Sequence, residues 1–187
     1  LVWMDVRNGV AGEWDYFNSD IYAQKLDSNG NQLWTADVRV NTDTDTASQY
    51  APGIAIDSQG NLLLVWDDDR NGNKDIYAQK LSASGNHMLL KDVRVNADIG
   101  VSQQSSPDMV SDSQGNLLIV WRDDRNGQDD LYAQKLDPSG NRLWATDVQV
   151  NKSNTDNIYP YSSPAITSDN QGNLVVAWVV SHNNSYD

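Results

Sequence analysis

The most specific chemical pattern in this sequence is a run of oxygen-bearing side chains between two apolar segments. They are Asp67, Asp69, Asn71 and Asp75. Oxygen ligands in this order, with a glycine after the third, are typical of calcium-binding loops of the EF-hand type. The run therefore predicts a Ca²⁺ site, the only cofactor that the sequence indicates. Ala78 stands where such loops carry a bidentate glutamate, and no helix is expected on either side.

A hairpin tip is the alternative for the same residues. Asn71-Gly72 between apolar runs favours a tight turn, because both residues tolerate positive φ. In that interpretation Asp69 and Arg70 are solvated and bind nothing. Arg122 replaces Asp67 in the following repeat, which a purely structural turn would tolerate.

An insertion at 10–19, eight residues longer than the equivalent segment of the other repeats, carries the second candidate site. It holds Trp14, Asp15 and Tyr16 together with the single phenylalanine of the chain. Aromatic rings stack on the apolar faces of sugars while carboxylates accept protons from sugar hydroxyls, so these three residues predict glycan binding. The alternative is a loop that packs its aromatic side chains on its own repeat.

Composition narrows the classes of partner. The formal net charge is −13, which disfavours nucleic acid and anionic membranes, and apolar runs such as Leu62–Trp66 are too short to cross a bilayer. Without cysteine, the chain has no disulfide, thiolate metal site or cysteine nucleophile. No catalytic set is recognised: His87 and His182 lie at turns without a Ser or Asp partner in a known motif, and Asp27–Trp34 departs from the Asp-box of sialidases.

The elements that carry these residues are repeats. The segment Asp20–Leu26 returns as Asp75–Leu81 and as Asp130–Leu136, at a constant interval of 55 residues. Each repeat predicts four short strands, which in the second repeat cover 52–56, 62–67, 76–81 and the neighbourhood of 93–95. Alternating apolar residues and Gly-Asn or Asn-Gly turns favour antiparallel hairpins.

Tandem four-stranded units predict consecutive antiparallel blades of an all-β propeller, in which each blade buries its faces against its neighbours. The whole chain, 1–187, is one repeat domain: a partial blade 1–41, blades 50–96 and 105–151, and a partial blade 163–187. Three blades are too few to close a ring, so we expect a fragment of a larger ring. Its open faces and strand edges predict that it folds poorly alone.

The pattern Asp-x-Arg-Asn-Gly followed by Asp-Ile-Tyr-Ala-Gln-Lys-Leu resembles repeats of large secreted or surface-exposed bacterial and archaeal proteins. The resemblance covers almost the whole chain. It implies a propeller-like extracellular module and a location outside the cell or on its surface. It implies no particular activity, because one fold hosts many functions.

Three hypotheses of function follow. The first is a non-enzymatic scaffold or adhesion surface without catalytic residues, whose partners are a protein or glycan at the cell surface, the remaining blades, or other subunits. The second is a glycan-binding, lectin-like propeller. The third is part of a sialidase-like or other glycoside hydrolase propeller whose active residues lie outside this sequence.

Overall fold

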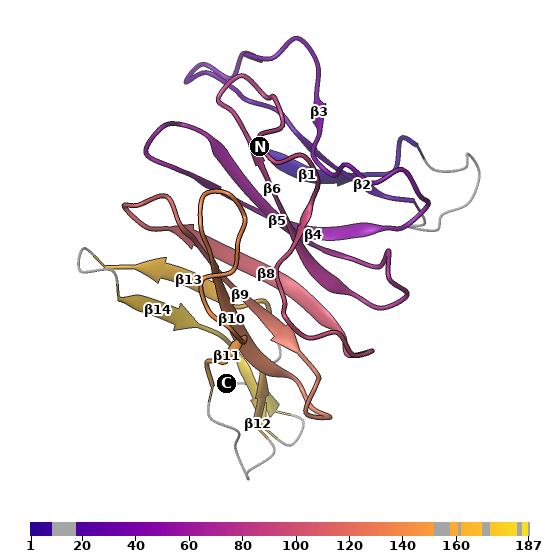
Figure 1. Cartoon of the computed structure of the whole chain (residues 1–187), viewed down its shortest axis with the longest axis vertical. Helices are drawn as coiled ribbons and strands as arrows, with labels where there is room; N and C mark the ends of the chain where they lie inside the picture. The colour runs from indigo at the N-terminus through magenta and orange to yellow at the C-terminus, as the bar shows by residue number, and fades with distance from the viewer. Residues whose placement is uncertain (9–17, 152–157, 161, 170–172, 183–184, 187) are drawn as a thin grey trace.

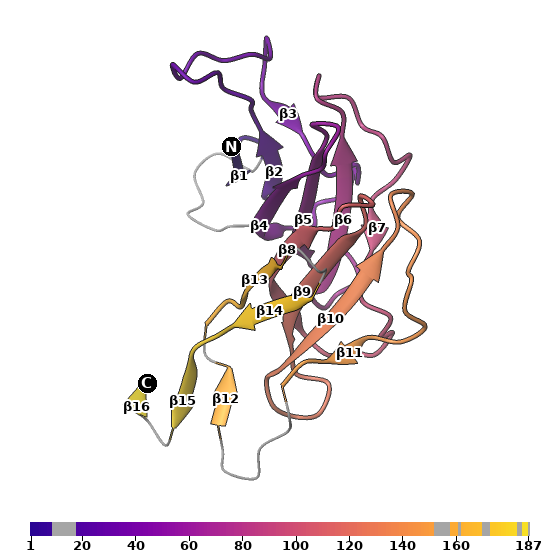
Figure 2. The same cartoon turned by 90° about the vertical axis from the view of Figure 1, so that its left-hand side faces the viewer.

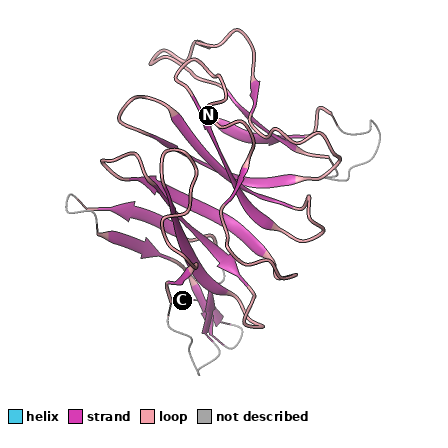
Figure 3. Ribbon diagram, viewed as in Figure 1, coloured by secondary structure: helices cyan, strands magenta, loops and turns pink. Residues whose placement is uncertain are grey.

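A computed structural model of the chain describes residues 1–8, 18–151, 158–160, 162–169, 173–182 and 185–186. Every regular element in these segments is a β-strand, as the uniform strand colour of Figure 3 shows. In the same segments, no helix has the length and apolar character needed to span a bilayer. The expected all-β class is confirmed.

Two complete four-stranded antiparallel sheets form the centre of the molecule (Figure 1). The sheet of the second repeat runs in the order β4 (Gln49–Ile56), β5 (Leu62–Asp68), β6 (Asp75–Leu81) and β7 (Val93–Arg94). That of the third repeat runs likewise through β8 (Gln104–Ser111), β9 (Leu117–Asp123), β10 (Asp130–Leu136) and β11 (Val148–Gln149). These are the propeller blades that the repeats predict.

The ends of the chain carry smaller sheets. The first repeat forms a sheet of β1 (Val2–Asp5), β2 (Asp20–Ala23) and β3 (Val38–Arg39). The fourth repeat begins with the pair β13 (Ala165–Ser168) and β14 (Leu174–Ala177). A further small sheet joins β12 (Ile158–Pro160), β15 (Val180–His182) and β16 (Ser185–Tyr186). Figure 2 shows the sheets following one another along the molecule.

The core lies between successive sheets, because alternate residues of one strand face opposite neighbours. Trp66 of β5 is fully buried and packs with Ile21 and Trp34 of the first repeat. Val65, the preceding residue, packs on the other side with Trp121 of the third repeat. The sheet of the second repeat therefore packs against a neighbouring repeat on each of its two faces, as the recurring tryptophans indicate.

The first strand of each complete blade is longer than the sequence suggests. Strand β4 begins at Gln49 rather than Pro52, and its pairing with β5 shifts between Tyr50 and Gly53. Such a bulge bends the strand and changes the direction of its side chains. Ala51 lies at the bulge with φ of 47°. The third repeat repeats the irregularity at Ser106, where φ is 55°.

A carboxylate closes the turn between the first and second strands. In the second repeat, Asp57 Oδ1 accepts the backbone N–H groups of Gln59 and Asn61, each at 2.9 Å. The Asn61 side chain donates to Oδ2 of the same aspartate at 3.0 Å. Asp27, Asp112 and Asp137 close other turns in the same way. These aspartates therefore stabilise turns through local hydrogen bonds to the backbone.

Candidate functional site

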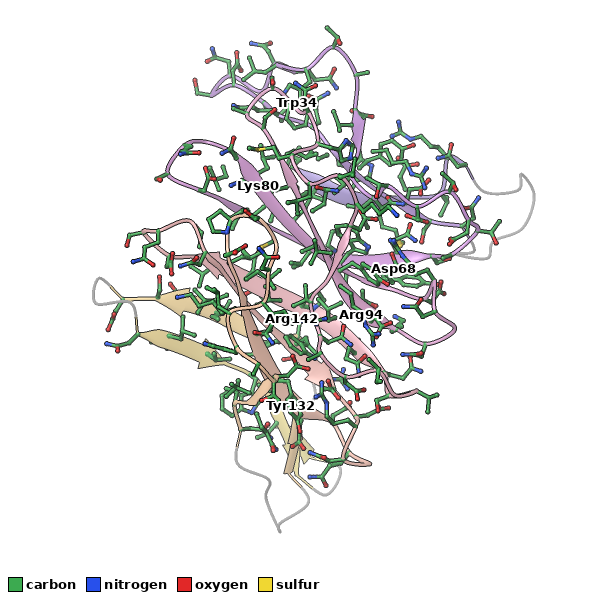
Figure 4. The ribbon with its side chains drawn as sticks, in the orientation of Figure 1. Trp34, Asp68, Lys80, Arg94, Tyr132 and Arg142 are labelled. Atoms are coloured by element: carbon green, nitrogen blue, oxygen red, sulfur yellow. The ribbon has the colours of Figure 1, made fainter. Side chains whose placement is uncertain are left out.

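A buried cluster around Asp68 closes the turn between the second and third strands of the second repeat. Asp68 is fully buried and accepts the indole N–H of Trp66 at 2.9 Å. The Arg70 guanidinium donates its Nε to the same carboxylate at 2.9 Å and stacks over the Tyr77 ring at 4.1 Å. Arg70 also contacts Asp92 at 3.0 Å. Figure 4 labels Asp68 at this edge of the blade.

The same cluster occurs in the other repeats. In the third repeat, Trp121 donates to Asp123 at 3.0 Å and Arg125 lies 4.1 Å from the centre of the Tyr132 ring. The first repeat builds it from Trp3, Asp5, Arg7 and Tyr22. A constellation present in three repeats is part of the blade framework. The expectation that Arg70 is solvated is wrong: its side chain is 15% exposed and bonded to carboxylates.

The four residues of the predicted calcium site bind protein groups and do not converge on one point; Asn71 and Asp75 bind each other. Asn71 donates to Asp75 Oδ2 at 2.7 Å, while Asn96 donates to Asp75 Oδ1 at 2.9 Å. Asp69 accepts the backbone N–H of Ser48 at 2.7 Å. The fourth residue, Asp67, faces the adjoining blade. Over the described segments, no three His, Cys, Asp or Glu side chains converge as metal ligands. The calcium site stays a prediction.

Trp14, Asp15 and Tyr16 lie outside the described residues, which resume at Asn18 near the end of the insertion. Asn18 donates its backbone N–H to Ser48 Oγ and its side-chain amide to the Asn8 carbonyl, both at 2.9 Å. Ser48 directly precedes β4. The insertion is therefore rooted at the edge that also carries Asp69.

Among the four residues of the predicted calcium site, Asp67 faces the adjoining blade and takes no part in the framework cluster around Asp68. It is 1% exposed, and its Oδ2 accepts the Lys74 ammonium at 2.7 Å. The Lys74 nitrogen lies 4.2 Å from the centre of the Tyr50 ring, at the bulge of β4. On the other side, the backbone N–H of Ser106, at the bulge of β8, reaches Asp67 Oδ1 at 3.4 Å. The bulges of β4 and β8 thus border an ion pair whose carboxylate is buried and whose ammonium is partly exposed.

Burial raises the pKa of the Asp67 carboxyl, and the hydrogen bond and charge of Lys74 oppose that rise. Desolvation acts in this way because the charged form loses its hydration. A buried carboxyl with a raised pKa, next to one specific charged partner, is a physical mark of functional sites.

The ion pair is reversed in the next blade. Arg122 stands at the position of Asp67 and Asp129 at the position of Lys74, and the two side chains form an ion pair of their own. Asp68 and Asp123, by contrast, are the same in both blades. The exchange of Asp67 for Arg122 lies on the face of β5 and β9 opposite the framework cluster. We define the candidate site by Tyr50, Asp67, Lys74 and Ser106.

Sequence reasoning found Asp67 but not the other three residues of the candidate site. A signal for Lys74 was present, because the exchange of Asp67 for Arg122 is matched by that of Lys74 for Asp129. Tyr50 and Ser106 left no such signal, since they join the site through the bulges of β4 and β8.

Comparison with known proteins bears on the fold and on the family. No curated protein matches the chain. The solved structures that resemble it include an endo-arabinase from Bacteroides thetaiotaomicron, with 18% identity over 90% of this chain and 63% of that one, and a TM-score of 0.47. A thermostable family-43 glycoside hydrolase has 12% identity over 89% of this chain and 64% of its own, with a TM-score of 0.49. The chain spans less than two thirds of the length of either.

These similarities correct the expectation that the chain is not an enzyme. One of the two structures is named as an endo-arabinase and the other as a glycoside hydrolase, so both carry the names of enzymes. Lack of a recognised motif in this chain does not exclude catalysis. The sequence profile of the BNR repeat-containing family matches residues 14–187. That match covers almost the whole chain, which therefore belongs to the BNR repeat-containing family.

Proposed function

We propose that these blades recognise a neutral carbohydrate at the edge where β5 turns into β6, with Tyr50 and Lys74 as the contacting side chains and Asp67 holding the Lys74 ammonium from behind. The observation that carries the proposal is the Asp67–Lys74 pair. The pair lies beside the bulges of β4 and β8 and is not part of the framework cluster around Asp68. In the next blade the charges of the equivalent pair are reversed. Residues that vary on a constant scaffold are where binding specificity is placed.

The chemistry of the site suits a sugar. A carboxylate accepts hydroxyl protons, an ammonium donates to hydroxyl and ring oxygens, and an aromatic ring offers an apolar face. The Lys74 side chain is 35% exposed, so its ammonium is within reach of a ligand, while Asp67 is held behind it. The insertion with Trp14, Asp15 and Tyr16 is rooted near Ser48, two residues before Tyr50.

The overall charge favours a neutral ligand over an acidic one. With a formal net charge of −13, the chain repels phosphorylated and sulfated polymers at low salt. A neutral polysaccharide does not meet this barrier, and its affinity should depend little on ionic strength.

Calorimetric titration with a panel of neutral polysaccharides tests the proposal, with a sulfated polysaccharide as the comparison. We expect saturable binding of a neutral member, weakened about tenfold or more in Lys74→Met, which removes the charge but keeps the length. Lys91→Met is the matched control, because Lys91 is exposed and belongs to the loop before β7. Equal binding by both variants, or no binding by the wild type, would refute the assignment.

Glycoside cleavage is the second candidate, and the raised pKa of Asp67 favours it. A general acid must hold its proton near working pH, and a buried carboxyl does so more readily than an exposed one. Such cleavage also needs a second carboxylate on the opposite side of the scissile bond. Reducing-sugar release by the wild type, abolished in Asp67→Asn with binding retained, would establish it. Retained release in Asp67→Asn would exclude Asp67 as the acid.

A further inference from the structure

The loop that joins the second repeat to the third, between β7 and β8, exposes two apolar side chains. Ile99 is 89% exposed and Val101 is 88% exposed. An apolar side chain stabilises a fold through the area that it removes from water, and these two remove almost none. Single exposed apolar residues are common on protein surfaces, but two of them on one short loop form a small apolar surface that the blades do not use.

The equivalent loop between the first and second repeats is polar. Thr44 and Thr46 hold the positions of Ile99 and Val101, 55 residues earlier, and both are exposed. Threonine and valine have nearly the same shape, so the main difference at Val101 is the loss of a hydroxyl group. Since one junction is built with threonine at both positions, the connection between blades does not require apolar residues there.

Hydrogen bonds fix the start of this loop. The backbone N–H of Ala97 donates to both oxygens of Asp147, at 3.0 and 2.9 Å. The Arg94 guanidinium and the Asn96 side-chain amide both donate to the Asp98 carbonyl, the amide at 3.3 Å. The apolar pair is therefore carried on a base that is held by both adjoining repeats.

The end of the loop is bonded to the turn that carries the candidate site. The Asn73 side chain donates to the Ser102 carbonyl at 3.0 Å, and the backbone N–H of Lys74 donates to Gln103 Oε1 at 3.1 Å. Ser102 directly follows Val101 in the sequence. The apolar pair is therefore continuous with the surface on which the Lys74 ammonium is exposed.

We propose that Ile99 and Val101 bind an acyl substituent, such as an O-acetyl group, on the polysaccharide whose sugar rings contact Tyr50 and Lys74. This inference rests on the proposed function and adds the class of ligand, a neutral polysaccharide esterified on some of its hydroxyls. An acetyl ester is uncharged, so it meets none of the repulsion that a net charge of −13 exerts on acidic polymers.

The hydrogen-bonding capacity of the loop favours an ester over a free hydroxyl. A sugar hydroxyl that loses water needs a new partner, and the side chains of Ile99 and Val101 provide none. An acetyl ester replaces the hydroxyl donor with a methyl group, which these side chains can cover. Tyr50 already supplies the flat ring that suits the face of an unsubstituted sugar, which leaves the aliphatic pair for the substituent.

Calorimetric titration with matched polymers tests the inference. The probes are partially O-acetylated glucomannan, xylan and glucan, each compared with the same polymer after its acetyl groups are removed with mild alkali. We expect the wild type to bind at least one acetylated polymer about five- to tenfold more tightly than its deacetylated form. Covering one methyl group is worth roughly fourfold in affinity, and two side chains contribute.

A double variant, Ile99→Thr with Val101→Thr, gives this loop the side chains of the first junction. It should bind both forms of the polymer equally, with the affinity of the wild type for the deacetylated form. Its denaturation midpoint should not change, because both side chains are exposed.

The matched control is Met88→Thr with Leu90→Thr. It also removes two exposed apolar side chains, but from the loop that follows β6, at the opposite end of that strand from Lys74. The control should keep the preference for the acetylated polymer. Equal loss of the preference in both double variants would show general apolar adsorption and would overturn the assignment.

The outcomes separate this inference from the proposed function. Equal binding of both forms by the wild type, with both weakened in Lys74→Met, overturns the acyl site and leaves the carbohydrate site in place. A preference that persists in the Ile99→Thr, Val101→Thr variant overturns the role of the loop. If the wild type binds none of the polymers in either form, the proposed function and this inference are refuted together.

Discussion

Asp67 and Asp68 are neighbours in β5 with opposite roles. Asp68 points into the second repeat's own cluster, where Trp66 and Arg70 bind it, and Asp5 and Asp123 do the same in other repeats. Asp67 points toward the third repeat, pairs with Lys74, and is exchanged for arginine one blade later. Alternation along a strand sends the two carboxylates to opposite faces of one sheet.

The difference shows how a repeat protein separates stability from specificity. One face of the strand carries a constant network that closes each blade, and the other carries side chains that differ between blades. Substitutions on the two faces should therefore have different consequences, and the following experiments measure that difference.

The largest effect is expected from Asp68→Ala. It leaves the Arg70 guanidinium and the Trp66 N–H without their shared acceptor, and breaking a buried ion pair costs about 3–5 kcal/mol. The measurement is the urea denaturation midpoint of the chain. Asp69→Ala is the control, because Asp69 is only half-buried and contacts a backbone N–H. Similar losses for both variants would contradict the framework role of Asp68.

A charge reversal tests the other face. Lys74→Asp alone places a second carboxylate beside buried Asp67 and should cost about 1–3 kcal/mol. Adding Asp67→Arg reproduces the pair of the third repeat and should recover most of that loss. Carbohydrate binding should stay lost in the double variant, because the reversed pair presents different donors and acceptors. Recovery of binding together with stability would make the pair a structural element.

The pH dependence of stability should differ between two carboxylates. Partial burial alone would raise the pKa of Asp112, but hydrogen bonds from Lys135 and Asn116 lower it to about 2. Its folded pKa lies below the unfolded value of about 3.9, so its contribution is present above pH ~4 and is lost as pH falls toward 2. Asp112→Asn should flatten the stability profile in that window; an unchanged profile would contradict the assignment.

For Asp67 the sign is opposite. Because burial raises its folded pKa, ionisation of Asp67 opposes folding, and protonation at low pH favours the folded state. Asp67→Asn should remove this part of the acid response while leaving the response of Asp112 in place. Denaturation midpoints between pH 2 and 7 distinguish the two.

The smallest effect is expected from His87→Gln. His87 contacts the Val40 carbonyl between blades, and the first repeat has glutamine at the same position. A glutamine amide donates to a carbonyl as well, so the loss should stay below about 1 kcal/mol. A thermal melting curve checks this. A large loss of stability in His87→Gln would show that the imidazole of His87 is required and that an amide cannot replace it.

Much of the architecture was determined by the sequence alone. The 55-residue interval, the Gly-Asn turns and the alternation around Trp66 and Trp121 specify four strands per repeat and their faces, because local turn geometry and side-chain period depend on nearby residues. The long first strand was not predicted in full, since Gln49 and Tyr50 precede a proline and a bulge that no apolar period reveals.

The candidate site was decided by the tertiary structure. A run of acidic residues in the sequence cannot tell that Asp75 turns to Asn96, Asp69 to Ser48 and Asp67 to Lys74. Those partners come from different loops of the same repeat, so only the folded blade determines which carboxylate closes the framework. It leaves Asp67 buried at the junction between blades, where Ser106 and Lys74 meet.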